Sequence, residues 1–209
     1  MRVYLRVPYP ERGDAKRLGA WYDGERKSWY VPDGVNPAPF SGWMRSCIYL
    51  VFAKRKCWRC KRLMTVVAFG VPYTLDGEGE DDLGLGMPYA DRLSILPRPL
   101  CTPREIRGYL EDNSGWHKGY SKTTEETHLM NHCEECGVLQ GDFFLFEEPD
   151  SPFFTPSKES LEAMRFLRVE VPWVGGELTG MSTCDDVFMS WARAHGEDLD
   201  LGVVEPLIF

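Results

Sequence analysis

The sequence lacks any apolar run approaching the roughly 18 residues that a membrane-spanning helix requires. Its N-terminus, Met1–Arg6, shows no apolar segment followed by the small-residue cleavage site of a secretory signal peptide. Internal repeats and low-complexity tracts are absent, and so are Gly-x-Ser-x-Gly, P-loop, His-Glu-x-x-His and paired-carboxylate motifs. These absences predict a cytoplasmic protein without membrane contact, and they make an enzyme the least favoured functional class.

The chain contains enough apolar residues to form a packed core. Of its 209 residues, 43% are hydrophobic and 13% are aromatic, which argues against a disordered chain. The net charge of −8 is unevenly distributed, because residues 1–62 hold 14 Lys and Arg against 5 Asp and Glu, and the remainder holds 10 against 27. A basic first third could contact phosphate groups that the acidic remainder would repel. Alternatively, the two parts simply attract each other within one fold.

The seven cysteines are an odd number, and four of them form two Cys-x-x-Cys pairs. In a chain without a signal peptide, this usage favours reduced thiols over disulfides. Two such pairs can complete a tetrahedral site of four sulfur ligands, which leaves no open position for water or substrate. The sequence therefore predicts one structural zinc ion, bound by Cys57, Cys60, Cys133 and Cys136. The lone Cys47, Cys101 and Cys184 are expected to be buried as small apolar residues.

The two pairs are separated by 72 residues, more than the usual spacing of a zinc ribbon. A long insertion, residues 61–132, must therefore deliver the second pair to the first. Gly137 after the second pair would let backbone amides face the thiolates, and the surrounding basic residues would lower the cysteine pKa. Two alternatives remain: the pairs are redox dithiols, or one pair is incidental. His128 or His132 could also replace a cysteine ligand.

Local patterns predict an α+β fold with two parts. The first, residues 1–40, is a β-α-β-hairpin module, with a strand over 2–7, a helix over 11–18 and a hairpin around Asp23-Gly24. The second, residues 41–209, is an elaborated zinc ribbon with peripheral helices. Its expected strands cover 48–52, 64–71, a hairpin at 120–132 and 143–146. Its expected helices cover 103–111 with a Thr102/Glu105 capping box, a segment from about 155, and a segment capped by Thr183 that ends at Gly196. The chain end, 205–209, should pack against the core.

Four short segments of the first part resemble a known module. They are Val7-Pro8-Tyr9, Ala15–Ala20, Tyr22-Asp23 and Lys27–Pro32. They are similar to the domain of unknown function found in bacterial, plasmid and phage proteins, including the N-terminal region of TraC-type plasmid primases. The resemblance covers about residues 3–40, and it departs from the family at Tyr22, where a tryptophan is usual. It implies a bacterial or mobile-element context and a nucleic-acid-associated adaptor, but no primase activity, because no primase catalytic domain is evident.

A second resemblance involves the region around the second cysteine pair. The segments Tyr120–Thr124, Asn131–Cys133 and Gln140–Phe144 look like a run in uncharacterised bacterial zinc-ribbon proteins. This likeness implies a zinc-binding context and no assigned activity.

The basic first third also contains aromatic residues that could stack on exposed bases while Lys and Arg contact phosphates. The candidate nucleic-acid-binding residues surround the first cysteine pair: Lys54, Arg55, Lys56, Trp58, Arg59, Lys61 and Arg62. Of the aromatic residues, Trp58 is expected to be exposed. The alternative is that most of the others form a core, namely Trp21, Tyr22, Trp29, Tyr30 and Trp43.

Two other functional classes stay open. The acidic remainder, with its Gly- and acid-rich segment 76–86, could bind a basic protein partner as an inhibitor or immunity protein would, or it could simply aid solubility. A thiol-dependent enzyme could use His117, His195 or a lone cysteine. His195 before Gly196 more simply places a cation near a helix C-terminus. The oligomeric state is not encoded in any recognisable pattern.

Overall fold

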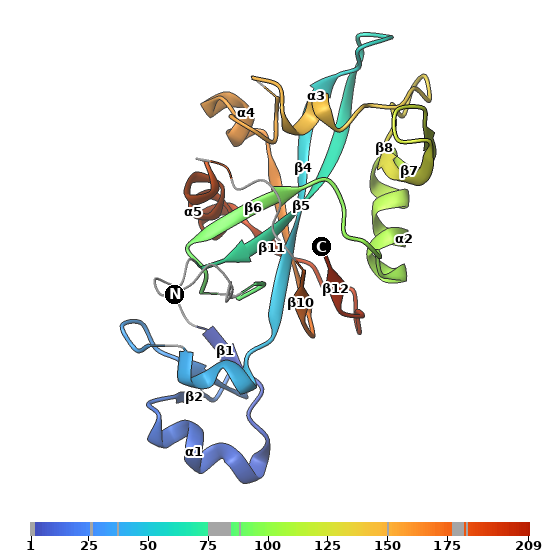
Figure 1. Ribbon diagram of the computed structural model, residues 1–209. Coiled ribbons are helices and arrows are strands. Elements are labelled where there is room, and N and C mark those ends of the chain that lie inside the picture. The colour runs from blue at the N-terminus through green and yellow to red at the C-terminus, as the bar shows by residue number, and fades with distance from the viewer. Residues whose placement is uncertain are drawn as a thin grey trace.

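The computed structural model describes residues 3–25, 27–36, 38–74, 85–87, 89–149, 151–176, 182 and 184–209. Within these residues the chain is α+β, as the sequence predicts, and it is built on a five-stranded sheet with a small three-stranded module at one end (Figure 1). No helix in the described part of the chain is both long and apolar enough to cross a membrane.

The central sheet has the strand order β11-β9-β4-β5-β6. Its bounds are β4 (Ser46–Lys56), β5 (Leu63–Tyr73), β6 (Arg92–Leu96), β9 (Arg165–Val171) and β11 (Glu197–Asp198). β4 pairs antiparallel with both β5 and β9, so it lies at the centre of the sheet. Because its residues from Ser46 to Ala53 are buried on both faces, this strand is a continuous apolar run in the sequence.

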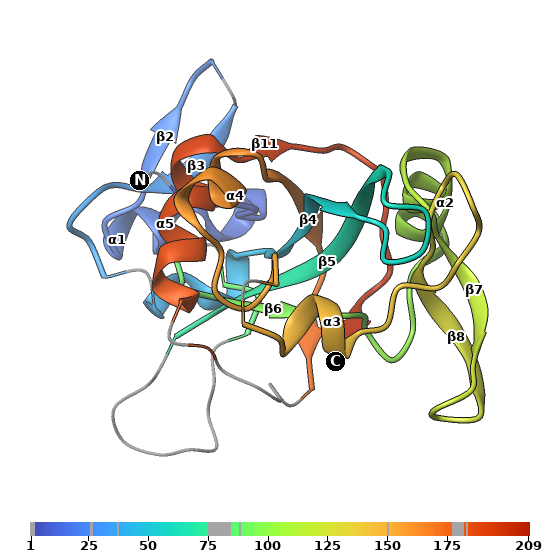
Figure 2. The ribbon, with the colours of Figure 1, turned by 90° about the horizontal axis from the view of Figure 1, so that it is seen from above.

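Each face of the sheet has its own hydrophobic core. One core contains alternate β4 residues such as Tyr49 and Val51, and is covered by α3 (Phe143–Phe146), α4 (Lys158–Glu162) and α5 (Asp185–His195). Figure 2 shows these helices around the sheet. The other core contains Ile48 and Leu50. It is covered by α2 (Arg104–Asn113), the hairpin β7 (Trp116–Ser121) and β8 (Glu126–Asn131), and the pair β10 (Val174–Gly175) and β12 (Leu207–Ile208).

The N-terminal module has the predicted β-α-β-hairpin order. It contains β1 (Val3–Leu5), a 3-10 turn η1 (Tyr9–Glu11), α1 (Arg12–Arg17), β2 (Trp21–Asp23) and β3 (Ser28–Val31). Gly19 ends the helical segment with a φ of 100°, a left-handed conformation that favours glycine. A second 3-10 segment, η2 (Ala38–Trp43), contributes the buried Phe40 to the core of the module. The amide of Arg6 donates to the Trp43 carbonyl oxygen at 2.8 Å, which ties η2 to the end of β1.

The predicted strand over 143–146 is wrong, because these residues form the single helical turn α3. The amides of Leu145 and Phe146 donate to the Asp142 carbonyl oxygen, and of the first three residues only Leu145 is buried, whereas Phe143 and Phe144 are exposed. An apolar run of four residues has no periodicity that separates a strand from a helical turn.

Two helix starts also differ from their sequence predictions. α2 begins after Pro103, and no side chain caps its N-terminus, so the Thr102/Glu105 capping box does not form. α4 begins at Lys158, where the Ser157 hydroxyl accepts from the Ser160 amide. The predicted cap Thr183 lies outside the described residues, whereas the chain end packs as predicted, with Leu207 buried in β12.

The lone cysteines differ in their exposure. Cys47 is buried in the central strand, as predicted. Cys101 is exposed and Cys184 is half-buried, so burial was wrongly predicted for both. Both lie just before a helix, where the chain crosses the surface: Cys101 precedes α2, and Cys184 is the N-cap residue of α5.

A buried carboxyl group lies at the start of α5. The Tyr73 hydroxyl donates to Asp185 Oδ2 at 2.7 Å, and the Ser182 amide donates to the same oxygen at 3.2 Å. Burial raises the pKa of Asp185 despite these two hydrogen bonds. The folded state therefore holds the Asp185 proton more tightly than the unfolded state does. Its stability falls as the pH rises from the ordinary carboxyl pKa through the raised folded value.

We expect Asp185→Asn to be more stable than the wild type at pH 7, by no more than about 1 kcal/mol. The amide oxygen still accepts both bonds without burying a charge, but the amide nitrogen takes the place of Oδ1, which has no partner among the described residues. The advantage should shrink as the pH falls from the raised folded pKa towards the ordinary carboxyl pKa, and it should be constant below that value. Urea unfolding of both proteins at matched pH values measures this difference. An advantage that is constant or grows between these two pKa values would contradict the assignment.

Candidate metal centre

Four cysteine sulfur atoms converge at the far end of the β4–β5 hairpin. All four Sγ atoms lie within 4.8 Å of one another, with Cys57 and Cys136 separated by 3.7 Å and Cys60 and Cys133 by the same distance. In a tetrahedral centre with metal–sulfur bonds near 2.3 Å, neighbouring sulfurs are about 3.8 Å apart. All four cysteines are free thiols. The donor set and its spacing therefore fit one metal ion.

The two Cys-x-x-Cys turns have the same backbone geometry. In the first, the Cys57 amide donates to the Arg62 carbonyl oxygen at 2.9 Å, and the Lys61 amide donates to the Cys57 carbonyl oxygen at 3.0 Å. In the second, Cys133 and Val138 make the equivalent of the first bond, and Gly137 and Cys133 make the equivalent of the second. This repeated arrangement defines two knuckles, residues 57–62 and 133–138.

The residue after each pair is in the left-handed region. Gly137 has a φ of 67°, which matches the expectation that a glycine is needed there. The first knuckle places Lys61 at the equivalent position with a φ of 63°. Lys61 Nζ donates to the Trp58 carbonyl oxygen at 2.7 Å, a bond that helps to hold this unfavourable conformation in place.

Polar donors surround the sulfur of Cys57. Burial opposes ionisation of this thiol, but hydrogen bonds from the backbone of Cys60 and Arg59 outweigh it and lower the pKa of Cys57 to about 6. The buried Gln140 adds an amide donor, with its Nε2 at 3.6 Å from Cys57 Sγ. Such outer contacts orient metal ligands. No sequence signal predicts this role, because a glutamine after a cysteine pair resembles any surface glutamine.

The insertion delivers the second knuckle through a side-chain clamp on β5. The buried Asn131 ends β8, its Oδ1 accepts from the Val67 amide at 2.8 Å, and its Nδ2 donates to the Val67 carbonyl oxygen at 2.9 Å. Asn131 thus satisfies the edge of β5 beyond the point where β6 pairs with it. The next residue, His132, donates its amide to the Gly115 carbonyl oxygen at 2.7 Å. Cys133 follows directly, so its position is fixed from the strand edge.

The histidines near the second pair are not part of the sulfur group that the described residues form. His132 is buried, its Nδ1 lies 3.0 Å from the Met130 carbonyl oxygen, and its ring stacks on His117 at 3.9 Å. His195 lies in the last turn of α5, with its ring 4.2 Å from that of Trp191.

The basic residues predicted to bind nucleic acid divide into two groups. Lys54 donates to Thr65 at 2.8 Å, Arg55 donates to the Phe144 carbonyl oxygen, and Arg62 pairs with Glu135 at 2.6 Å. These three therefore serve intramolecular contacts. Lys56, Arg59 and Lys61 are exposed on or next to the first knuckle, with Glu134 and Glu135 exposed on the second.

Trp58 is exposed, as predicted, with 53% of its surface accessible. Its indole Nε1 donates to the Leu139 carbonyl oxygen at 2.8 Å, so the ring bridges the two knuckles. Of the other aromatic residues, Trp21 and Tyr22 are exposed, whereas Tyr30 is buried and Trp29 and Trp43 are half-buried. The acidic segment 76–86 falls outside the described residues up to position 84.

Comparison with known proteins places a relative only at the N-terminus. The chain is 52% identical over 44 residues to a DNA primase TraC from Escherichia coli, and 52% identical over 42 residues to a second DNA primase TraC from the same organism. These matches cover 21% and 20% of this chain but only 4% and 3% of the two primases. No solved structure matches the chain. Residues 2–45, which contain the N-terminal module, match the domain of unknown function DUF5710.

Proposed function

We propose that this chain is a non-catalytic, zinc-stabilised binding protein of a bacterial or mobile-element system, and that it contacts single-stranded nucleic acid through the surface of its first knuckle. Zinc is the ion that suits four thiolates in a closed tetrahedral site. A full set of sulfur ligands leaves no position for a reactant, so the ion would act in folding. The knuckle surface would then supply the binding function.

The observation that carries the nucleic-acid proposal is the exposed, anchored ring of Trp58. Its bond to Leu139 holds the indole across both knuckles, so little side-chain freedom remains to be lost when a base stacks on it. Exposed Lys56 and Arg59 lie close by along the chain and could contact phosphates, whereas Lys61 bonds to the Trp58 carbonyl oxygen. The DUF5710 segment supports the same context, because the relatives that share it carry the name DNA primase.

Replacing Trp58 with alanine should weaken binding of a single-stranded oligonucleotide about 5- to 100-fold, the loss expected when one stacked base loses its platform. Trp173→Ala is the matched control, because Trp173 is also 53% exposed but follows β9, away from the knuckles. Fluorescence anisotropy with a labelled oligonucleotide over a range of salt concentrations measures both effects. The slope against salt should be shallower for Arg59→Gln than for the wild type.

A further variant separates stacking from folding. Trp58→Phe loses the bond to Leu139 but keeps an aromatic face, so it should bind more tightly than Trp58→Ala. Equal affinity of the wild type, Trp58→Ala and Trp173→Ala at every salt concentration would refute the proposal. Metal analysis of the purified wild type tests the zinc assignment separately, with one ion per chain expected.

A further inference from the structure

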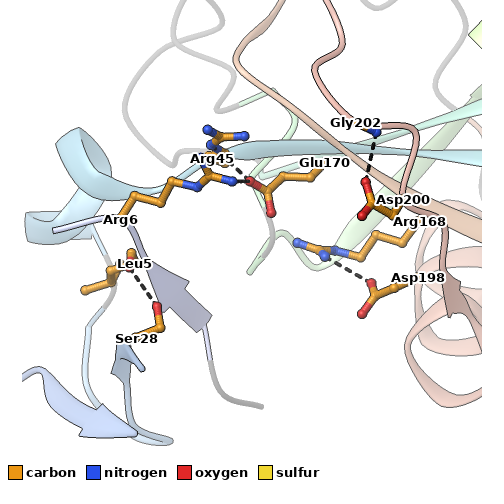
Figure 3. Close-up of polar contacts among 9 residues, drawn as sticks. All are labelled: Leu5, Arg6, Ser28, Arg45, Arg168, Glu170, Asp198, Asp200 and Gly202. Atoms are coloured by element: carbon orange, nitrogen blue, oxygen red, sulfur yellow. Dashed lines mark hydrogen bonds and ion pairs between the residues drawn. The ribbon is translucent and has the colours of Figure 1, made fainter. Parts of the chain in front are cut away.

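A cleft of about 650 Å³ lies between the N-terminal module and the central sheet (Figure 3). Tyr4, Arg6 and Ser28 line it from the module. Arg45 lines it from the segment before β4, and Glu170 from β9. The volume lies within the range of about 300–1,000 Å³ that is common for small-molecule sites. Figure 1 shows the module at one end of the molecule and the β4–β5 turn that carries the first knuckle at the other, so this cleft is separate from the metal centre.

Arginine outnumbers acid where the module meets the sheet. Arg6 Nη2 and Arg45 Nε lie 3.2 Å and 3.0 Å from the same oxygen, Oε1 of Glu170. One carboxylate therefore faces two guanidinium groups, and one positive charge is left over at this corner. On β9, two residues before Glu170, Arg168 is balanced by Asp198 at 3.1 Å (Figure 3). Arg193 and Asp200, which carry opposite charges, also line the cleft, so the lining as a whole has one net positive charge.

Arg6 and Arg45 keep donors for a ligand. Among the described residues, the ion pair of Arg45 with Glu170 is made by Nε. Both terminal nitrogens of the Arg45 guanidinium group are therefore available to donate to a ligand. The side chains of Arg6 and Arg45 are 63% and 36% exposed, so a solute can reach them, whereas Glu170 Oε1 itself is buried. A planar guanidinium group can donate two parallel hydrogen bonds to two oxygens of one phosphate. A bound anion would also offset the excess positive charge.

We propose that the cleft binds a small phosphate monoester, with its phosphate on Arg6 and Arg45 and its organic part in the space beside Tyr4 and Ser28. Glu170 holds both guanidinium groups in position when the cleft is empty and lowers the affinity for anions.

Because Glu170 competes with the ligand for the two arginines, its substitution is expected to strengthen phosphate binding. Glu170→Gln removes the competing carboxylate, so it should bind adenosine 5′-monophosphate, ribose 5-phosphate and inorganic phosphate at least about threefold more tightly than the wild type does. Arg45→Gln removes donors and should weaken all three by about tenfold or more. Calorimetric titration of the full chain measures these affinities, and adenosine without a phosphate should not bind.

The probes and variants have defined outcomes. Tighter binding of both esters than of inorganic phosphate supports a site for the whole monoester. Absence of phosphate binding in both the wild type and Glu170→Gln overturns the proposal. An affinity for phosphate that neither substitution changes also overturns it. So does binding of adenosine as tight as that of adenosine 5′-monophosphate. If Arg45→Gln fails to fold, the phosphate affinity of Glu170→Gln relative to the wild type tests the proposal by itself. Trp58→Ala should leave phosphate affinity unchanged, which separates this site from the proposed nucleic-acid surface.

Discussion

Cys133→Ser is expected to abolish metal binding and to unfold the protein, or at least to lower its melting temperature by more than 15 °C. Zinc bound by four thiolates contributes on the order of 10 kcal/mol to the folding of small domains, which is comparable with the whole stability of a typical protein. Three remaining sulfurs would hold the ion weakly and leave the second knuckle unanchored. Circular dichroism melting and zinc stoichiometry of the same preparation measure the two effects together.

Cys101→Ser is the matched control for this experiment. It makes the same chemical change at an exposed cysteine outside the sulfur group, so its stability should stay within about 0.5 kcal/mol of the wild type. A chelator added to the wild type should reproduce the loss seen with Cys133→Ser. If Cys133→Ser melts like Cys101→Ser and the wild type purifies without metal, the four sulfurs do not form a metal centre.

Asn131→Ala is expected to destabilise the protein by about 2–5 kcal/mol. The substitution removes both partners of the buried Val67 backbone, and each unpaired buried group costs roughly 1–3 kcal/mol. Because Asn131 lies two residues before Cys133, zinc affinity should fall together with stability. Urea unfolding and competition with a chromophoric chelator provide the two measurements.

Asn113→Ala provides the comparison for the Asn131 clamp. Asn113 is exposed and donates a single bond, to the Tyr109 carbonyl oxygen at 2.8 Å, so its loss should cost no more than about 1 kcal/mol. Similar unfolding free energies for the two variants would mean that water replaces the Asn131 side chain at β5. In that case the insertion would be held by the metal rather than by the strand edge.

Local signals account for the parts of the fold that were predictable. The Asp23-Gly24 turn, the alternation of Val3, Leu5 and their neighbours, and the cysteine spacing each specify their structure within a few residues. The hairpin predicted at 120–132 is present, but its first strand, β7, begins earlier than predicted, at Trp116. The convergence of the two cysteine pairs was predicted from the chemistry of thiolates. No local pattern, however, indicates how the intervening residues 61–132 pack against the sheet.

The remaining features depend on partners far away in the sequence. Arg55 and Arg62 resembled exposed phosphate-binding residues, but Arg55 contacts the Phe144 carbonyl oxygen and Arg62 contacts Glu135. These partners are known only once the knuckles have docked. The same holds for the Asn131 clamp and for the arginine pair at Glu170, because each joins segments whose register no local pattern determines.

The strand order of the central sheet leaves one edge of β4 unpaired in the nascent chain. β4 receives β5 as soon as the hairpin emerges from the ribosome, but its other edge stays open until β9, residues 165–171, has been made. Cys136 is synthesised before β9, so zinc could join the two knuckles while one edge of β4 is still unpaired. In metal-starved cells the two knuckles would stay unjoined during this interval, and insoluble nascent protein should accumulate.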